Sequence, residues 1–234
     1  MIFITGDTHG MYDIEKLNLF NNNLTRDTSN FNCNSLDYMI IVGDAGIIWY
    51  NDYRDEYHIK AYENFPWTTL FIDGNHENHA ALAKYPVEEW HGGLVHRISP
   101  KILHLMRGQV YTIEEKTFFT MGGADSVDKM YRVKGQSWWA EELPSAAELD
   151  TGIKNLEKYD FKVDYVLTHC CGDKYLPQLY HSSHINRDSL TSYFNHLEDD
   201  FHLQYKMWYF GHHHLDKILD DNKHVCLYQN IIEV

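Results

Sequence analysis

The sequence has little cysteine and no long hydrophobic run, and each shortage excludes a class of protein. The 234 residues include only four cysteines, Cys33, Cys170, Cys171 and Cys226, and two of these are adjacent. Their spacing fits no zinc site, and adjacent cysteines suit no ordinary disulfide. No apolar run approaches the ~18 to 20 residues that a membrane helix requires, and the start of the chain lacks the basic residues of a signal peptide. We therefore expect a soluble, cytoplasmic protein with reduced thiols.

Basic residues are scarce as well. Lys and Arg total 20 against 34 Asp and Glu, which gives a net charge of −14 when every histidine is neutral. Duplex nucleic acid and anionic membranes attract basic surfaces, so we expect no indiscriminate binding to either. A phosphorylated substrate is not excluded, because bound divalent metal ions would reverse the electrostatic field around them.

The chain is long enough, at 44% hydrophobic residues, for one well-buried domain. No repeat or linker divides it, so residues 1–234 are predicted to form a single domain. Apolar strand patterns at 2–5, 37–42 and 68–72 alternate with helical patterns at 12–20, 52–65 and 77–84, and the polar stretch 21–34 predicts a loop. This order indicates right-handed crossovers and a largely parallel sheet.

The pattern changes at residue 92. Short strand patterns at 94–98, 102–106, 109–113 and 117–121 have no helix between them, which predicts a second, antiparallel sheet packed on the first. A helix should follow from Pro144 to Tyr159, with Ser145 and Glu148 spaced as a capping box. A strand at 163–168 is expected to return to the first sheet. Another helix at 188–199, a strand at 207–210 and a hairpin at 215–228 complete the chain.

Five of these strands end in the same way, because side chains that bind metals follow the apolar run directly. The ends carry Asp7 and His9, then Asp44, then Asn75 and His76, then His169, and finally His212, His213 and His214. In four of the five a glycine comes first and lets the backbone turn sharply. The pattern predicts a metal site centred on Asp44, at one edge of a sheet.

These strand ends resemble the five motifs of the calcineurin-like metallophosphoesterases, in the order of that family. The matching segments are Gly6-Asp7-Thr8-His9, Gly43-Asp44, Gly74-Asn75-His76-Glu77, Thr168-His169 and Gly211-His212-His213-His214. The resemblance spans residues 1–214. It implies an α/β protein with a four-layer α/β/β/α sandwich, and an enzyme that hydrolyses phosphoester bonds.

The resemblance also implies two divalent metal ions. Position by position, Asp7, His9, Asp44 and His214 would hold the first ion, and Asp44, Asn75, His169 and His212 the second. The shared carboxylate would bridge ions ~3.5 to 4 Å apart, and a water between them would lose a proton and attack the phosphorus. Mixed imidazole, carboxylate and amide ligands suit Mn, Fe, Zn, Co or Ni better than Ca or Mg, and the resemblance favours Mn²⁺. His76 would act as the catalytic acid at the leaving oxygen.

Other histidines and cysteines have simpler interpretations. A histidine at a strand end can also be a hydrogen-bonded core residue, and only the joint pattern favours ligands. In an extended segment His213 would point away from its two neighbours, so it is not included. The remaining ten histidines, among them His79, His91, His96 and His104, are assigned to surface or core. Cys170 and Cys171 are interpreted as small packing residues.

The substrate class depends on which residues hold the phosphate. Protein serine/threonine phosphatases of this superfamily carry arginines near the second and third motifs, whereas here Ala45 follows Asp44 and Asp73 precedes Gly74. Because arginine is a bidentate phosphate clamp, this departure disfavours a phosphoprotein phosphatase or a close diadenosine tetraphosphatase relative. A phosphodiester or nucleotide-type substrate is slightly favoured, because one fewer clamp fits a less charged phosphate.

A replacement clamp is predicted in residues 122–139. Arg132 and Trp138 are candidate contacts for a phosphate and a base; alternatively, the exposed-looking Trp138 and Trp139 cover the core and the charges are solvated. The rival functions are a phosphomonoesterase acting on small molecules or proteins, and a non-catalytic binding scaffold. The scaffold is disfavoured because every ligand and the acid are present.

Overall fold

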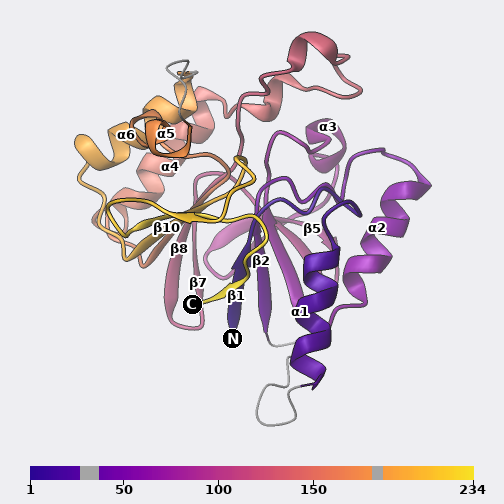
Figure 1. Cartoon of the computed structure of the whole chain (residues 1–234). Helices are drawn as coiled ribbons and strands as arrows, with labels where there is room; N and C mark the ends of the chain where they lie inside the picture. The colour runs from indigo at the N-terminus through magenta and orange to yellow at the C-terminus, as the bar shows by residue number, and fades with distance from the viewer. Residues whose placement is uncertain (27–36, 181–186) are drawn as a thin grey trace.

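The computed structural model describes residues 1–26, 37–180 and 187–234, which form two β-sheets packed face to face (Figure 1). The described strands of the first sheet have the order β13 (Ile232–Glu233), β1 (Ile2–Thr5), β2 (Tyr38–Val42), β3 (Thr68–Ile72), β6 (Ile102–Leu105), β5 (Gly93–Ser99) and β4 (Val87–Trp90). Those of the second have the order β11 (Lys217–Ile218), β12 (His224–Cys226), β10 (Met207–Phe210), β9 (Tyr165–Thr168), β8 (Lys116–Met121) and β7 (Gln109–Ile113).

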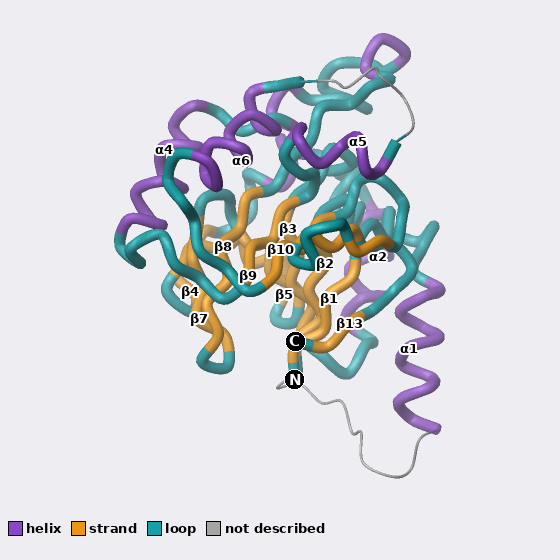
Figure 2. The backbone as a smooth tube through the Cα atoms, turned by 60° about the vertical axis from the view of Figure 1, so that its left-hand side comes forward, coloured by secondary structure: helices purple, strands orange, loops and turns teal. Residues whose placement is uncertain are grey.

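Helices cover the outer face of each sheet (Figures 1 and 2). The first sheet is covered by α1 (Glu15–Arg26), α2 (Tyr53–Glu63) and α3 (His79–Leu82), and the second by α4 (Ala146–Glu157), α5 (Leu176–Leu179) and α6 (Ser189–Asp199). Short 3₁₀ helices occur at Lys129–Tyr131, Ala140–Glu142 and Asp173–Tyr175. The predicted capping box at Ser145 and Glu148 is confirmed at the start of α4. None of the described helices is long and apolar enough to cross a membrane.

The strands supply three hydrophobic cores because successive side chains of a strand point to opposite faces. In β2, Ile40 and Val42 join the core between the two sheets, whereas Met39 and Ile41 join the core beneath α1, α2 and α3. The second sheet divides its residues in the same way, and its outward side chains pack against α4, α5 and α6. The predicted four-layer α/β/β/α sandwich is therefore confirmed.

Two predictions about sheet membership are wrong. Residues 92–123 do not form a sheet of their own, because β5 and β6 extend the first sheet while β7 and β8 begin the second. The strand at 163–168 joins the second sheet as β9, where it pairs in parallel with β8 and β10. The ring of Tyr165 stacks on Phe118 of β8, with centroids 5.0 Å apart. Side-chain pairs between neighbouring strands help to decide which sheet a strand joins. An apolar run in the sequence does not show which strand will be its neighbour.

Several boundaries also differ from the prediction. The first helix begins later, at Glu15, and continues to Arg26 through residues assigned to a loop; the rest of that loop, 27–34, lies outside the described residues. Adding residues to a helix costs less than starting one, and Leu17 and Phe20 pack on the core. The third helix is only four residues long, and it begins at His79 because Asn78 caps it. The edge strands β4 and β13 were not predicted.

One predicted tryptophan and three of the cysteines are buried. Trp139 is buried, at 4% exposure, and its ring centroid lies 5.3 Å from that of Trp49, so it is not exposed and agrees with the alternative prediction that it covers the core. Cys170, Cys171 and Cys226 are free and buried, as packing residues should be. Cys33 lies outside the described residues.

Candidate metal centre

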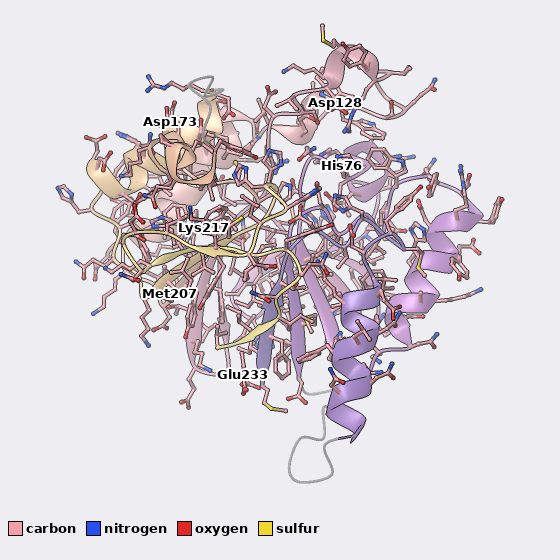
Figure 3. The ribbon with its side chains drawn as sticks, in the orientation of Figure 1. His76, Asp128, Asp173, Met207, Lys217 and Glu233 are labelled. Carbon is pink, nitrogen blue, oxygen red and sulfur yellow. The ribbon has the colours of Figure 1, made fainter. Side chains whose placement is uncertain are left out.

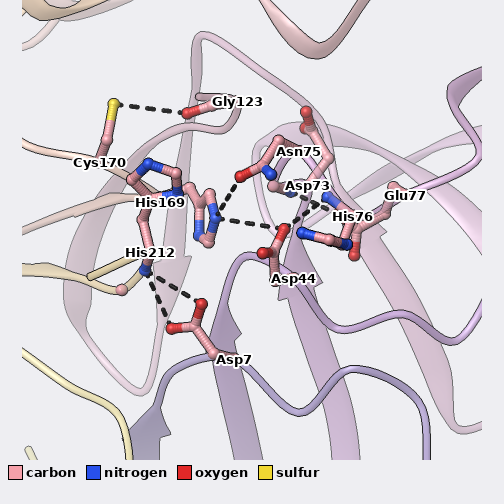
Figure 4. A network of polar contacts seen from close by, with 12 residues as sticks. Asp7, Asp44, Asp73, Asn75, His76, Glu77, Gly123, His169, Cys170 and His212 are labelled. Carbon is pink, nitrogen blue, oxygen red and sulfur yellow. Dashed lines mark hydrogen bonds and ion pairs between the residues drawn. The ribbon is translucent and has the colours of Figure 1, made fainter. Parts of the chain in front are cut away.

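The predicted strand-end residues meet where the carboxyl ends of both sheets lie together (Figures 3 and 4). Strands β1, β2 and β3 run parallel to one another, and so do β9 and β10. The two sets of ends are joined directly, because the His169 Nδ1 lies 2.9 Å from the carbonyl oxygen of Val42. The backbone N–H of His212 also donates to both carboxylate oxygens of Asp7. Side chains from two sheets thus share one site.

Asp44 lies at the middle of this site, with its two oxygens facing different histidines. Its Oδ2 is 3.4 Å from His9 Nε2, and its Oδ1 is 3.2 Å from His169 Nε2. The described donor atoms that could hold a metal form three groups, and the atoms of each group lie within 4.8 Å of one another. One group is Asp7, His9 and His214, another is Asp44, His169 and His212, and a third combines His9, Asp44 and His76. A carboxylate in this position can bridge two ions.

The amide of Asn75 belongs to the same arrangement. Its Oδ1 lies 3.3 Å from His169 Nε2, while its Nδ2 donates to the Ser126 hydroxyl. Ser126 in turn donates to the buried carboxylate of Glu142. These contacts turn the amide oxygen, which is the atom able to ligate a metal, toward the site.

Hydrogen bonds at the far side of each ring aim two histidines at the site. His9 Nδ1 lies 2.7 Å from the Asp13 carboxylate, and His169 Nδ1 faces the Val42 carbonyl. With Nδ1 occupied, the Nε2 atom of each ring faces Asp44. Such outer partners fix ring orientation in metal sites. Asp13 was not among the predicted site residues, although it lies only four residues after the candidate ligand His9, in the turn before α1.

The electrostatics of the site favour positive charge. Burial alone would lower the pKa of His169, but the adjoining carboxylate of Asp44 outweighs it and raises the pKa to about 10. Burial is likewise outweighed at His9, where Asp44 and Asp13 raise the pKa to about 9. Asp44 itself is buried, yet the two histidines hold its pKa well below the usual range. The carboxylates thus stabilise positive charge on the neighbouring imidazoles. The same set of donor atoms therefore also suits divalent cations.

Two glycines make room for the ligands. A Cβ on Gly74 would lie 2.1 Å from Asp44 Oδ1, and a Cβ on Gly43 would lie 2.1 Å from His169 Nδ1. Gly43 also has a φ of +88°, which side chains rarely tolerate. Gly43 therefore admits a ligand from the other sheet, and Gly74 admits one from the neighbouring strand.

The backbone is strained at the site itself. Five of the seven predicted ligands have a positive φ between 44° and 66°: Asp7, His9, Asp44, His212 and His214. For residues other than glycine this left-handed conformation costs roughly 1–3 kcal/mol each, and it persists only where the surrounding structure imposes it. Such strain is concentrated at functional sites.

His76 lies beside Asp44 without being part of either predicted ligand set. Its backbone N–H donates to Asp44 Oδ1 at 2.7 Å, and its ring stacks on Trp49. The Arg132 Nη2 lies 3.1 Å from His76 Nε2. Burial and the charge of Arg132 lower the pKa of His76, although Asp44 opposes them. The predicted substrate residue Arg132 and the predicted acid are therefore in contact.

Other predicted residues lie elsewhere. The ring of Trp138 has Lys134 Nζ 5.9 Å from its centroid, and no described contact joins it to His76; its role in substrate binding stays a prediction. His213 faces Tyr180, whose hydroxyl is 2.8 Å from its Nδ1. None of the metal-type groups among the described residues includes it.

Two buried ionisable side chains support the loops and were given no role by the sequence. Glu77 accepts hydrogen bonds from the backbone of Gly46 and Gly74, and burial beside Asp44 raises its pKa to about 8. The ammonium of Lys16 donates to the carbonyls of Asp7 and Tyr228, and burial lowers its pKa to about 8. Glu77 is part of the third motif, but its hydrogen bonds to the two loops were not predicted.

Two sheets flanked by helices, with clustered aspartates and histidines at their carboxyl ends, define the class of metallophosphoesterases. The chain belongs to the calcineurin-like phosphoesterase family, whose model matches residues 1–216. The predicted family and the predicted hydrolase acting on phosphoester bonds are confirmed. The family implies divalent metal ions, and the grouped donors are suited to them.

Similar solved structures have low sequence identity. A putative 5'-nucleotidase from Staphylococcus aureus is 12% identical, with a TM-score of 0.47, over 97% of this chain and 48% of that one. A phosphopantetheinyl hydrolase from Mycobacterium tuberculosis is 11% identical, with a TM-score of 0.45, over 97% of this chain and 87% of that one. This chain thus spans about half the length of the first. No curated protein matches the sequence.

Proposed function

We propose that this phosphoester hydrolase works with two divalent metal ions. Asp7, His9, Asp44 and His214 would hold one ion, and Asp44, Asn75, His169 and His212 the other. The observation that carries this proposal is the position of Asp44, whose two oxygens lie 3.4 and 3.2 Å from histidines on opposite sides. When bound, the ions supply a water activated for attack and offset the charge of the phosphate.

The chain's own residues contribute orientation and a proton. Asp13 and the Val42 carbonyl fix the rings of His9 and His169, so their Nε2 atoms face Asp44. His76 is proposed to stabilise or protonate the leaving oxygen, because its ring lies beside the predicted ligands and is held by Trp49 and Arg132. Mn²⁺ is the proposed metal, with Fe, Zn, Co or Ni as alternatives for the same mixed donor set.

A small phosphodiester or nucleotide-type substrate is proposed over a phosphomonoester. The position before Gly74 carries Asp73, which is buried and bonded to Arg107 and His104, so Arg107 is committed to a structural ion pair. Arg132 also pairs with Asp128, but its Nη2 contacts His76, and this contact makes it the candidate clamp among the described residues. A single clamp suits the lower charge of a diester. A phosphomonoesterase is the second candidate, and a non-catalytic scaffold is the least favoured.

Replacing Arg132 with alanine is expected to raise KM by roughly tenfold, because hydrogen bonds to charged groups are worth about 1.5–3 kcal/mol. Steady-state kinetics on the better ester would measure the effect. Lys129→Ala is the matched control, since Lys129 lies on the same segment and pairs with Asp125 as Arg132 pairs with Asp128, but only Arg132 has a described contact with His76. Equal KM values for Arg132→Ala and the wild type would remove Arg132 from the substrate site.

A paired assay tests the proposed function. The Mn²⁺-loaded protein would be given p-nitrophenyl phosphate and bis-p-nitrophenyl phosphate, with Asp44→Asn and a chelated sample as blanks. Faster hydrolysis of the diester is expected. A preference for the monoester would make the protein a phosphomonoesterase. If the protein hydrolysed neither ester, the proposal that it catalyses hydrolysis of such esters would be contradicted.

A further inference from the structure

A pocket of about 430 Å³ opens beside the candidate metal centre. His9, His76 and His214 form its inner side, and these residues also contribute to the metal-type groups. Its remaining walls come from Tyr12, Gly46, Trp49, Tyr50 and His58. The volume lies within the ~300–1,000 Å³ of small-molecule sites. A substrate whose phosphate occupies the metal centre would therefore extend into this pocket.

The walls are largely aromatic, and four of the lining residues are histidines. None of the lining residues is Asp, Glu, Lys or Arg, and the residues beyond the shared histidines include three large rings, Tyr12, Trp49 and Tyr50. Tyr12 is 85% exposed, so its ring lines the pocket without contributing to the hydrophobic core. Such a lining matches a planar, uncharged ring. The Arg54 guanidinium, 3.6 Å from the centroid of the Tyr50 ring, adds one positive charge beside this wall.

One buried carboxylate holds the aromatic wall in place. Asp55, on α2, is 5% exposed and accepts hydrogen bonds from the backbone N–H groups of Trp49, Tyr50 and Asn51. The Asn78 side chain donates to the Trp49 carbonyl from the other side. The backbone that carries the two rings is therefore held in place before any substrate arrives, and such preorganisation lowers the entropic cost of binding.

We infer that this pocket binds a planar aromatic ring of the substrate, so that the protein acts on phosphate esters bearing a nucleobase-like or aryl group. The inference rests on the proposed function, because the phosphate is taken to lie at the metal centre. It also moves the ring-binding role from Trp138, which does not line the pocket, to Trp49, Tyr50 and Tyr12.

Two phosphonates that cannot be hydrolysed provide the test. Benzylphosphonate and cyclohexylmethylphosphonate have the same charge and similar size, but only the first carries a planar ring. Calorimetric titration of the Mn²⁺-loaded protein should give a Kd about tenfold lower for benzylphosphonate, which is the order of one ring stack. Tyr12→Ala and Tyr50→Ala should each reduce this ratio several-fold, and Tyr12→Phe should keep it. Tyr53→Ala is the matched control, because Tyr53 is an exposed tyrosine nearby that does not line the pocket.

The outcomes separate the two proposals. Equal affinity for both phosphonates, or an unchanged ratio in both alanine variants, would overturn the ring pocket even if phosphate esters are hydrolysed. Absence of hydrolysis, together with binding that does not depend on Mn²⁺, would instead overturn the proposed function. A ring preference that requires Mn²⁺ and weakens in the Tyr12 and Tyr50 variants supports the inference.

Discussion

Asp44→Asn is expected to remove both metal ions and to lower turnover by roughly 1,000-fold or more, since two-ion stabilisation supplies several kcal/mol of the barrier. Asparagine keeps the shape and one oxygen, so the hydrogen bond from the His76 backbone can persist. Asparagine lacks the negative charge of Asp44. It also has a single side-chain oxygen, so it cannot present one oxygen to His9 and another to His169. Elemental analysis and hydrolysis of a p-nitrophenyl ester would measure the two effects together.

A variant on one side of the site provides the control. His169→Ala should empty only the position shared by Asp44, Asn75, His169 and His212, and should leave the other ion bound. Circular dichroism would show whether each variant is folded before its metal content is interpreted. Retention of two ions and of wild-type turnover in Asp44→Asn would exclude the bridging role.

The second large effect is expected for His76→Asn, which should lower turnover by roughly 100-fold or more while metal content stays at the wild-type level. The reason is that the ring of His76, which stacks on Trp49 and contacts Arg132, lies outside both proposed ligand sets and can serve the leaving oxygen. The loss should be larger for an alkyl ester than for a p-nitrophenyl ester, because a poor leaving group depends more on a proton.

A nearby histidine gives the comparison for His76. His79 is three residues further along the chain and belongs to none of the metal-type groups found among the described residues. His79→Asn should leave turnover of both esters nearly unchanged. A proportional loss of bound metal in His76→Asn would show that His76 acts as a ligand and not as an acid.

Much of the fold follows from local sequence signals. Strands β3 and β7 have the predicted boundaries, Thr68–Ile72 and Gln109–Ile113, because turn residues bound short apolar runs. The strand-end pattern also identified side chains that the structure brings together around Asp44. Sheet membership could not be predicted in this way, because β9 is equally apolar on both faces and its place depends on Phe118 and the neighbouring strands.

The parts of the site that escaped prediction depend on contacts between distant residues. Lys16 reaches the Tyr228 carbonyl, which lies 212 positions away in the chain. Trp49 follows the second motif without any local pattern, yet its ring stacks on His76 from the third. Backbone strain at Asp44 is likewise invisible in the sequence, because aspartate rarely adopts a positive φ.

The meeting of two sheets at one metal centre has a thermodynamic consequence. The first sheet contributes Asp7 and Asp44 and the second His169 and His212, so an ion bound among them crosslinks the layers without a covalent bond. A ligand that binds only the folded chain adds stability, about 2.7 kcal/mol when it is present at 100 times its Kd. Metal supply would then govern the lifetime of the fold as well as its activity, which would be visible as a melting temperature that rises with metal concentration.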